Sequence, residues 1–196
     1  MTKLKKIALL IMFTILIICF LLIYVFDIAK LLHPKKYEQY VSKYSREYDV
    51  DELLIYAIIK IESNFNENAS SHVNAIGLMQ LMENTAIDIN NKINEEQITE
   101  QEMYDPETNI KLGTCYFSML LKRYGNIGLA LAAYNAGMGR VDEWIKNGTI
   151  QQDGSDLENI PFKETDLYVR KVINNYEKYK KIYDKSTWNK NKGVVC

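Results

Sequence analysis

Glu62 is the residue whose place in the sequence most clearly suggests chemistry. It follows Leu54 and Ile58 at intervals of four residues, so on a helix the three side chains share one face. A carboxyl group at the end of an apolar face is partly desolvated, and its pKa rises because burial penalises the charged form. A carboxyl group that keeps its proton near neutral pH can serve as a general acid. The pattern alone leaves open that Glu62 only marks the polar boundary of the helix.

Other kinds of site are disfavoured by the composition. The three cysteines, Cys19, Cys115 and Cys196, are scattered and odd in number, and the two histidines, His33 and His72, have no second ligand at metal-binding spacing. The chain has 24 Lys and Arg residues against 25 Asp and Glu residues, with no basic stretch interleaved with aromatic residues. We therefore expect no metal, no cofactor and no nucleic-acid partner.

An uncharged run of twenty residues, Ile7 to Phe26, lies near the start of the chain. A helix needs about 20 apolar residues to cross a bilayer core, so this run predicts a transmembrane segment. The run is longer than the apolar part of a signal peptide, and no small-residue cleavage site follows it, so we expect an uncleaved anchor in the cytoplasmic membrane. Three lysines precede the run and three follow it, so the charges do not decide its orientation.

The rest of the chain predicts an all-α domain, because helical periodicity recurs and no convincing strand pattern is present. A stripe of tyrosines with Val41 favours a first helix from about Pro34. Asp49, three residues before Glu52, predicts a capping box at the start of the helix that carries Glu62 and ends near Ser63. Further helices are expected at about 110–124, 127–136, 140–146 and 165–183, with three glycines as C-terminal stops: Gly125, Gly137 and Gly148.

Three segments predict irregular structure. Asn64 to Gly77 is polar and small, which is typical of a loop between helices. Glu83 to Glu107 holds eight acidic residues against one lysine and favours a solvated, loop-rich segment. The tail beyond Asp184 has no periodicity. We therefore expect an N-terminal segment with the membrane anchor at 1–32, a catalytic domain at 33–184 and a flexible tail at 185–196.

Four blocks of sequence carry a further signal: IESNFNENASSHVNAIGLMQLMENTA at 61–86, YDPETNIKLGTCYFSML at 104–120, ALAAYNAG at 130–137 and IPFKETDLYVRKV at 160–172. In this order they resemble the soluble-type lytic transglycosylases, lysozyme-like enzymes that cleave bacterial peptidoglycan. The resemblance extends over nearly all of residues 37–183. It implies a lysozyme-like helical domain with a glycan-binding groove.

The resemblance assigns Glu62, in the ES pair, to the single catalytic acid of the family. Such enzymes protonate the glycosidic oxygen between N-acetylmuramic acid (MurNAc) and N-acetylglucosamine (GlcNAc). The 6-hydroxyl of the muramic acid then attacks its own anomeric carbon and leaves a 1,6-anhydro end. One carboxyl group serves as acid and then as base, with the substrate's acetamido group in place of an enzyme nucleophile. No acidic partner faces Glu62 at helical spacing, although folding can bring a distant one near, which leaves a two-carboxylate hydrolase open.

Seven further residues match family positions at the substrate. An amide such as that of Gln80 can both donate to and accept from an acetamido group, and a tyrosine ring can lie along a sugar. The structural alternatives are a turn hydroxyl for Ser71, core packing for Met79 and a helix-capping carboxylate for Glu164. The implied substrate-binding residues are Ser71, Met79, Gln80, Tyr134, Asn135, Glu164 and Tyr168, of which Tyr168 is expected beside Glu62 to orient it.

The sequence therefore predicts a membrane-anchored peptidoglycan lytic transglycosylase. Its substrate lies outside the cytoplasmic membrane, so the catalytic domain is expected on the extracytoplasmic side. Two alternatives are a lysozyme-type hydrolase that uses water and a non-catalytic glycan-binding module on a membrane helix. Wall turnover, spore germination, DNA transfer and insertion of a secretion machine all need local opening of the wall, and the sequence identifies no such wall-spanning partner.

Overall fold

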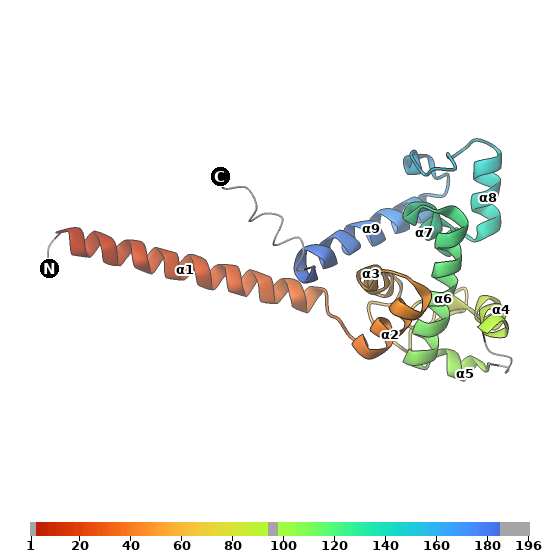
Figure 1. Ribbon diagram of the computed structural model, residues 1–196, viewed down its shortest axis with the longest axis horizontal. Helices are drawn as coiled ribbons and strands as arrows, with labels where there is room; N and C mark the ends of the chain where they lie inside the picture. The colour runs from red at the N-terminus through yellow and green to blue at the C-terminus, as the bar shows by residue number, and fades with distance from the viewer. Residues whose placement is uncertain (1–2, 94–97, 185–196) are drawn as a thin grey trace. The chain divides into compact units, whose positions relative to one another are not determined.

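The computed structural model describes residues 3–93 and 98–184, which fall into two units. The first unit holds the described residues up to Pro34 and from Lys181 onward, and the second is Lys35–Lys180. Helix α1, Lys3–Leu32, belongs to the first unit. The other elements, labelled in Figure 1, are α2 (Glu38–Tyr48), α3 (Glu52–Glu62), β1 (Ala75–Ile76), β2 (Leu81–Met82), α4 (Glu83–Ile93), α5 (Glu100–Met103), α6 (Pro106–Tyr124), α7 (Ile127–Ala136), α8 (Met138–Lys146), the 3-10 helix η1 (Leu157–Asn159) and α9 (Lys163–Tyr183).

Helix α1 is long and apolar enough to cross a membrane by length and composition, with a mean hydropathy of 3.1 in its most apolar window. It contains the predicted span at 7–26. The large apolar side chains described along it are exposed. Water solvates such an apolar surface poorly.

Helix α6 is the centre of the second unit and packs against α2, α4, α5 and α7. Its start is fixed by Asp105, whose side chain accepts the N–H of Thr108 at 2.9 Å, and by Pro106 in the first turn. Its end is fixed by Gly125, which adopts the left-handed conformation with φ 64°. Helix α7 is short, and the five residues from Leu129 to Ala133 are 0% exposed, so it forms the middle of the core.

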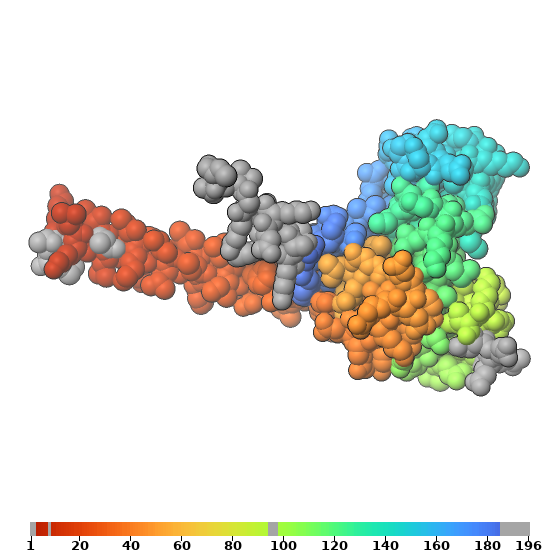
Figure 2. Space-filling model, in the orientation of Figure 1, coloured from red at the N-terminus to blue at the C-terminus, as the bar shows by residue number. Residues whose placement is uncertain are grey.

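Figure 2 shows residues of α8 (cyan) and of α4 (yellow-green) at opposite ends of the second unit on the face in view. Figure 1 shows α3 between α2 and α9. Tyr56 of α3 is fully buried and stacks on Tyr179 of α9, with ring centroids 5.7 Å apart. This contact helps to hold the helix that carries Glu62 against the C-terminal helix.

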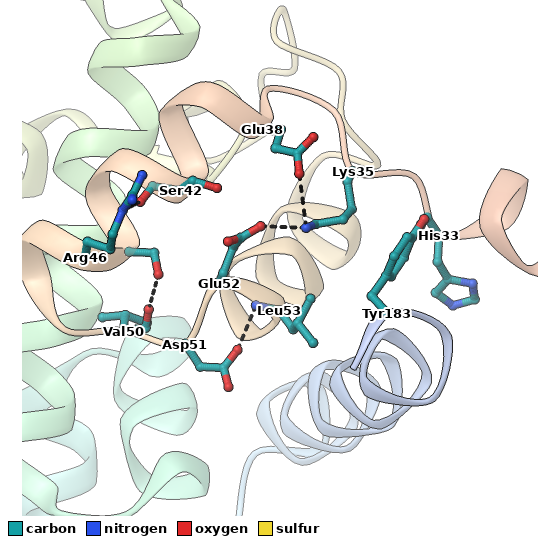
Figure 3. Close-up of polar contacts among 11 residues, drawn as sticks. His33, Lys35, Glu38, Ser42, Arg46, Val50, Asp51, Glu52, Leu53 and Tyr183 are labelled. Atoms are coloured by element: carbon teal, nitrogen blue, oxygen red, sulfur yellow. Dashed lines mark hydrogen bonds and ion pairs between the residues drawn. The ribbon is translucent and has the colours of Figure 1, made fainter. Parts of the chain in front are cut away.

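The start of α3 differs from the prediction, which placed a capping box on Asp49 and Glu52. Asp49 ends α2 in the left-handed conformation, with φ 56°. The cap of α3 is instead Asp51, whose Oδ1 accepts the N–H of Leu53 at 2.7 Å (Figure 3). Glu52 forms an ion pair with Lys35 at 2.7 Å.

The first helix of the unit also begins later than predicted. Helix α2 starts at Glu38 rather than near Pro34, because Tyr37 takes the left-handed conformation with φ 59° and interrupts the periodicity. Val41 and Tyr44 are buried, so this part of the stripe packs on the core as expected, and Tyr40 and Tyr48 are partly exposed. Lys35, in the non-helical stretch before α2, contacts Glu38 at 3.3 Å (Figure 3).

The prediction of a loop-rich acidic segment from Glu83 to Glu107 was wrong. The described part of this segment forms α4, α5 and the start of α6. Ala86, Ile89 and Met103 are at most 2% exposed, whereas Glu83, Asp88, Glu100 and Glu102 are exposed on the outer face of α4 and α5. A high charge density marks an exposed helix face as readily as it marks a loop.

The remaining predictions of secondary structure hold with small shifts of boundary. The all-α class is confirmed, and the described chain adds one short antiparallel pair, β1 with β2, that pairs Ala75 with Met82. The pair closes the segment that was predicted as a loop after Asn64. The tail at 185–196 lies outside the described residues.

Candidate active site

Glu62 is the last residue of α3, at the end of the apolar face that the spacing predicted. Leu54 and Ile58 on that face are 1% and 0% exposed. Glu62 itself is partly exposed, with its carboxyl group largely surrounded by protein. Burial raises the pKa of this carboxyl group from 4.5 to about 7, because the charged form loses its hydration.

Tyr168 of α9 lies against this carboxyl group. Its hydroxyl donates to Oε1 of Glu62 at 2.5 Å and comes from a residue 106 positions away in the sequence. Donation to the charged form lowers the pKa of Glu62, but burial is the larger effect. Burial, together with the charge of Glu62, raises the pKa of Tyr168 well above 10, so the phenol remains a donor. Glu62 therefore protonates near neutral pH, and the hydrogen bond from Tyr168 holds its carboxyl group in place.

Burial raises the pKa of Tyr134 of α7, and this residue is near enough to the carboxyl group of Glu62 for the charge of Glu62 to raise that pKa further. Its hydroxyl donates to the backbone carbonyl of Met79 at 2.7 Å, and its ring packs on Tyr116 and Phe117 at centroid distances of 5.4 and 5.9 Å. The hydroxyl proton of Tyr134 is therefore already donated to a group of the protein.

The turn between β1 and β2 carries Met79 and Gln80. The side chain of Met79 is 0% exposed and contacts the hydroxyl of Thr114 at 3.9 Å. Gln80 has φ 49°, and its amide nitrogen donates to the carbonyls of Ala69 and Gly77 at 3.1 and 2.9 Å. Gln80 is thus held by backbone carbonyls, and Met79 is held by packing in the core.

Ser71 shapes the loop before β1. Its Oγ accepts the N–H of Val73 at 3.3 Å and that of Ala75 at 3.0 Å, which is the turn role considered as its structural alternative. The hydroxyl proton of Ser71 is not used by these two contacts, so it can still be donated outward.

Asn135 and Glu164 lie where α7 ends and α9 begins. Asn135 is exposed, and its Oδ1 accepts the hydroxyl of Thr165 at 2.8 Å. Glu164 is exposed in the first turn of α9, where a carboxylate is favoured by the helix dipole. Asn135 is thereby tied to the helix that also presents Tyr168.

Two residues that the sequence reasoning did not select hold the site together. The Oγ of Ser63 donates to the carbonyl of Leu78 at 2.8 Å and links the end of α3 to the β1–β2 turn. Asn109 is 0% exposed, and its side chain makes three hydrogen bonds to backbone groups. Asn109 stands in the polar stretch PETNIK at the start of α6, so the local sequence gave no signal for its burial, and its partners could not be read from spacing.

Within residues 3–93 and 98–184, burial and the hydrogen bond from Tyr168 are the causes of the shifted pKa of Glu62, and no second carboxylate is among them. Glu67, in the loop after α3, accepts the hydroxyl of Tyr37 at 2.8 Å. The same described residues contain no group of three or more His, Cys, Asp or Glu side chains that could hold a metal ion. The arrangement can deliver and take back one proton at a single carboxyl group.

Comparison with known families gives a match to the Transglycosylase SLT domain over residues 39–156. The chain is 36% identical to the soluble lytic murein transglycosylase of Salmonella typhimurium over 146 residues, covering 71% of this chain and 22% of that relative. It is 40% identical to the membrane-bound lytic murein transglycosylase C of Sodalis glossinidius over 116 residues, covering 54% of this chain and 32% of that one.

Solved structures give the same result. The 70 kDa soluble lytic transglycosylase of Escherichia coli aligns with a TM-score of 0.71 and 31% identity, covering 81% of this chain and 26% of that chain. An inactive mutant of the lytic transglycosylase Slt of Pseudomonas aeruginosa aligns with a TM-score of 0.70 and 35% identity, covering 76% and 24%. The chain spans about a third or less of the length of each of these four proteins.

Proposed function

The chain belongs to the Transglycosylase SLT domain family, and on that premise we propose that it is a peptidoglycan lytic transglycosylase with Glu62 as its general acid and base. The relatives are named as lytic murein transglycosylases. The observation that carries the proposal is the pKa of about 7 at Glu62, a carboxyl group that Tyr168 orients at 2.5 Å.

In the first step the protonated carboxyl group of Glu62 gives its proton to the oxygen that links MurNAc to GlcNAc. The bond from this oxygen to the anomeric carbon breaks as the acetamido group of the muramic acid supports that carbon. In the second step the 6-hydroxyl attacks the anomeric carbon, and the carboxylate of Glu62 takes the hydroxyl proton. The acid is regenerated, and no water is consumed.

A pKa of about 7 suits both steps, because general acid catalysis is most efficient when the pKa lies near the working pH. Tyr168 keeps donating to the carboxylate after the first step, which stabilises the charge that forms there. Its own pKa stays well above 10, so it does not compete as the acid.

The remaining site residues are proposed to bind the glycan with the polar atoms that the protein leaves available. Gln80 uses its amide nitrogen on backbone carbonyls, so its Oε1 would accept from an acetamido N–H. Asn135 uses its Oδ1 on Thr165, so its amide nitrogen would donate to the sugar. Ser71 would donate its hydroxyl proton. The exposed Glu164 would accept from sugar hydroxyls.

Tyr134 and Met79 are proposed to act differently from the other site residues. The hydroxyl of Tyr134 donates to Met79, and the side chain of Met79 is fully buried. We therefore propose that Tyr134 contacts the substrate through its partly exposed ring, and that Met79 supports the site by packing in the core without touching the substrate.

We further propose that α1 anchors the protein in the cytoplasmic membrane through residues 7–26 as a single span. Its length and composition fit a membrane helix, and some relatives are named membrane-bound. The catalytic domain at 33–184 would then lie on the extracytoplasmic side with its polymer. The first 32 residues would serve as the anchor.

The experiment that tests the chemistry is digestion of purified peptidoglycan by the full chain in detergent. Mass spectrometry of the released muropeptides should find anhydro ends, which are one water lighter than hydrolysed ends. Predominantly hydrolysed ends would contradict the proposal and favour a lysozyme-type hydrolase.

A second arm separates an enzyme from a glycan-binding module. Glu62→Gln keeps an oxygen that can accept from Tyr168 but has no acidic proton to transfer, so it should bind glycan strands and release no products. Glu67→Gln is the matched control in the adjoining loop and should cleave like the unaltered chain. Cleavage by Glu62→Gln would overturn the assignment of the acid.

A further inference from the structure

Asn109 is a buried side chain whose whole amide group is used for holding backbone. It lies in the first turns of α6 and is 0% exposed. Its Oδ1 accepts the N–H of Met79 at 2.8 Å, and its Nδ2 donates to the carbonyls of Ile76 and Met103 at 3.0 and 2.8 Å. A buried amide with all these partners fixes their relative positions, because leaving any of the buried partners unpaired costs free energy.

The turn that Asn109 holds is strained and closely packed. Gly77 has φ 76°, and a Cβ atom there would lie 2.3 Å from Nδ2 of Asn109, so no side chain fits. Gln80 takes φ 49°, a conformation that residues other than glycine rarely adopt. A backbone held in this way persists only where its surroundings determine it. Asn109 is one of the groups that determine it.

The same turn is joined to the catalytic centre by two other contacts. Met79 gives its N–H to Asn109 and receives the hydroxyl of Tyr134 on its carbonyl at 2.7 Å. Ser63, the residue after Glu62, donates to the carbonyl of Leu78 at 2.8 Å. A shift of this turn would therefore reach Tyr134, Gln80 and the end of α3 together.

We propose that Asn109 is a positioning residue of the active site. By accepting the N–H of Met79, it fixes the position of the Leu78–Gln80 turn relative to Glu62. Tyr134 and Gln80 then contact the glycan in the productive geometry. This role rests on the proposed transglycosylase activity. Asn109 touches neither the proton nor the sugar.

The variant Asn109→Asp gives a signature in the pH profile. When protonated, the aspartic acid keeps an oxygen for the N–H of Met79 and a hydroxyl for the carbonyl of Ile76 or Met103. When ionised, it places a charge against those two carbonyl oxygens in a buried site. Burial favours the neutral form, so the protonated state extends to higher pH than in water. The activity of this variant relative to the unaltered chain should rise as the pH falls from 8 to 5.

Asn109→Leu has a similar size and no polar group, so its activity relative to the unaltered chain should not change with pH. We expect a loss in kcat/KM on the order of 10- to 100-fold, since displacements of about 1 Å in an active site cost this much. Ser118→Ala is the matched control. Ser118 is also buried on α6, and its hydroxyl donates to the carbonyl of Tyr48 at 2.6 Å, which is not part of the turn. It should lose stability and keep kcat/KM.

A purely structural role would give a different result. The assays use the full chain in detergent, at a temperature where circular dichroism finds each variant folded. If folded Asn109→Asp and Asn109→Leu matched Ser118→Ala in kcat/KM, with ratios that do not depend on pH, the positioning role would be refuted. Non-additive losses on combining Asn109→Leu with Tyr134→Phe would support it, because Asn109 bonds to the N–H of Met79 and Tyr134 to its carbonyl.

Failure of the proposed function has its own readout. If the unaltered chain released no anhydro products, the transglycosylase assignment itself would fail, whereas anhydro products from Glu62→Gln would overturn only the assignment of the acid. Hydrogen exchange at the Met79 amide is independent of activity. It should be slow in the unaltered chain and in Ser118→Ala, and fast in Asn109→Leu. If exchange at the Met79 amide were unchanged in Asn109→Leu, the claim that Asn109 fixes this turn would be refuted, independently of any activity measurement.

Discussion

Replacing Glu62 by glutamine should stabilise the protein, and the gain should depend on pH. The folded chain raises the pKa of Glu62 from 4.5 to about 7, so between these values the folded state binds more protons than the unfolded state. The free energy of unfolding therefore falls as the pH rises through this window. Stability from this group is complete below pH 4.5 and is lost above about pH 7. Glutamine does not titrate and escapes the loss.

The size of the effect follows from the pKa. The difference between 4.5 and about 7, at about 1.4 kcal/mol for each pH unit, corresponds to roughly 3 kcal/mol. Glu62 is partly exposed, and glutamine must bury its own amide, so the observed gain should be smaller. For a unit the size of Lys35–Lys180, 1 kcal/mol moves the Tm by about 2–4 °C. We expect Glu62→Gln to raise the Tm by about 5 °C at pH 8 and to leave it nearly unchanged at pH 4.5.

Thermal unfolding followed by circular dichroism between pH 4.5 and pH 8 measures this difference directly. Glu83→Gln removes an exposed glutamate at the start of α4 and is the matched control, so the two variants are compared at each pH. A gain for Glu62→Gln that is equal at all pH values would refute the reasoning. A gain in Tm for Glu62→Gln that is smaller at pH 8 than at pH 4.5 would also refute it.

Three further predictions concern the elements around the acid. Tyr168→Phe removes the donor that lowers the pKa of Glu62, so the alkaline limb of the pH–rate profile should move to higher pH, and a move to lower pH would contradict the pairing. Gly113→Ala places a Cβ atom 2.5 Å from Sδ of Met79, so stability measured by urea unfolding should fall by about 1–3 kcal/mol, and an unchanged midpoint would count against the packing. Asp51→Ala removes the cap of α3 and should cost about 0.5–2 kcal/mol in the same assay, whereas an unaltered midpoint would argue against the cap.

Much of the fold could be predicted because its signals are local. Helix α6 ends at Gly125 and α7 ends at Gly137, and a glycine at this position is a common signal for the end of a helix. The choice between Asp49 and Asp51 as a cap was not decided by local pattern, since both precede the same helix. It depended on the left-handed conformation of Asp49, which closes the previous helix.

The site was less accessible to sequence reasoning, because its contacts join distant residues. The apolar face of α3 indicated a desolvated Glu62, but only the family resemblance indicated Tyr168, which is 106 residues away. Asn109 and Met79 are 30 residues apart and meet through a backbone N–H, a partner that every residue except proline offers. The residue types involved in such contacts therefore do not predict which residues will meet.

The protonation of Glu62 is the central claim, and a carbon-13 NMR titration of its carboxyl group in the full chain tests it most directly. The spectrum of Glu62→Gln would assign the signal. The account predicts a midpoint at about pH 7, so that a large fraction of the carboxyl groups is protonated at neutral pH. A midpoint near 4.5 would contradict it, because a carboxyl group that ionises like one in water could not supply the proton at neutral pH.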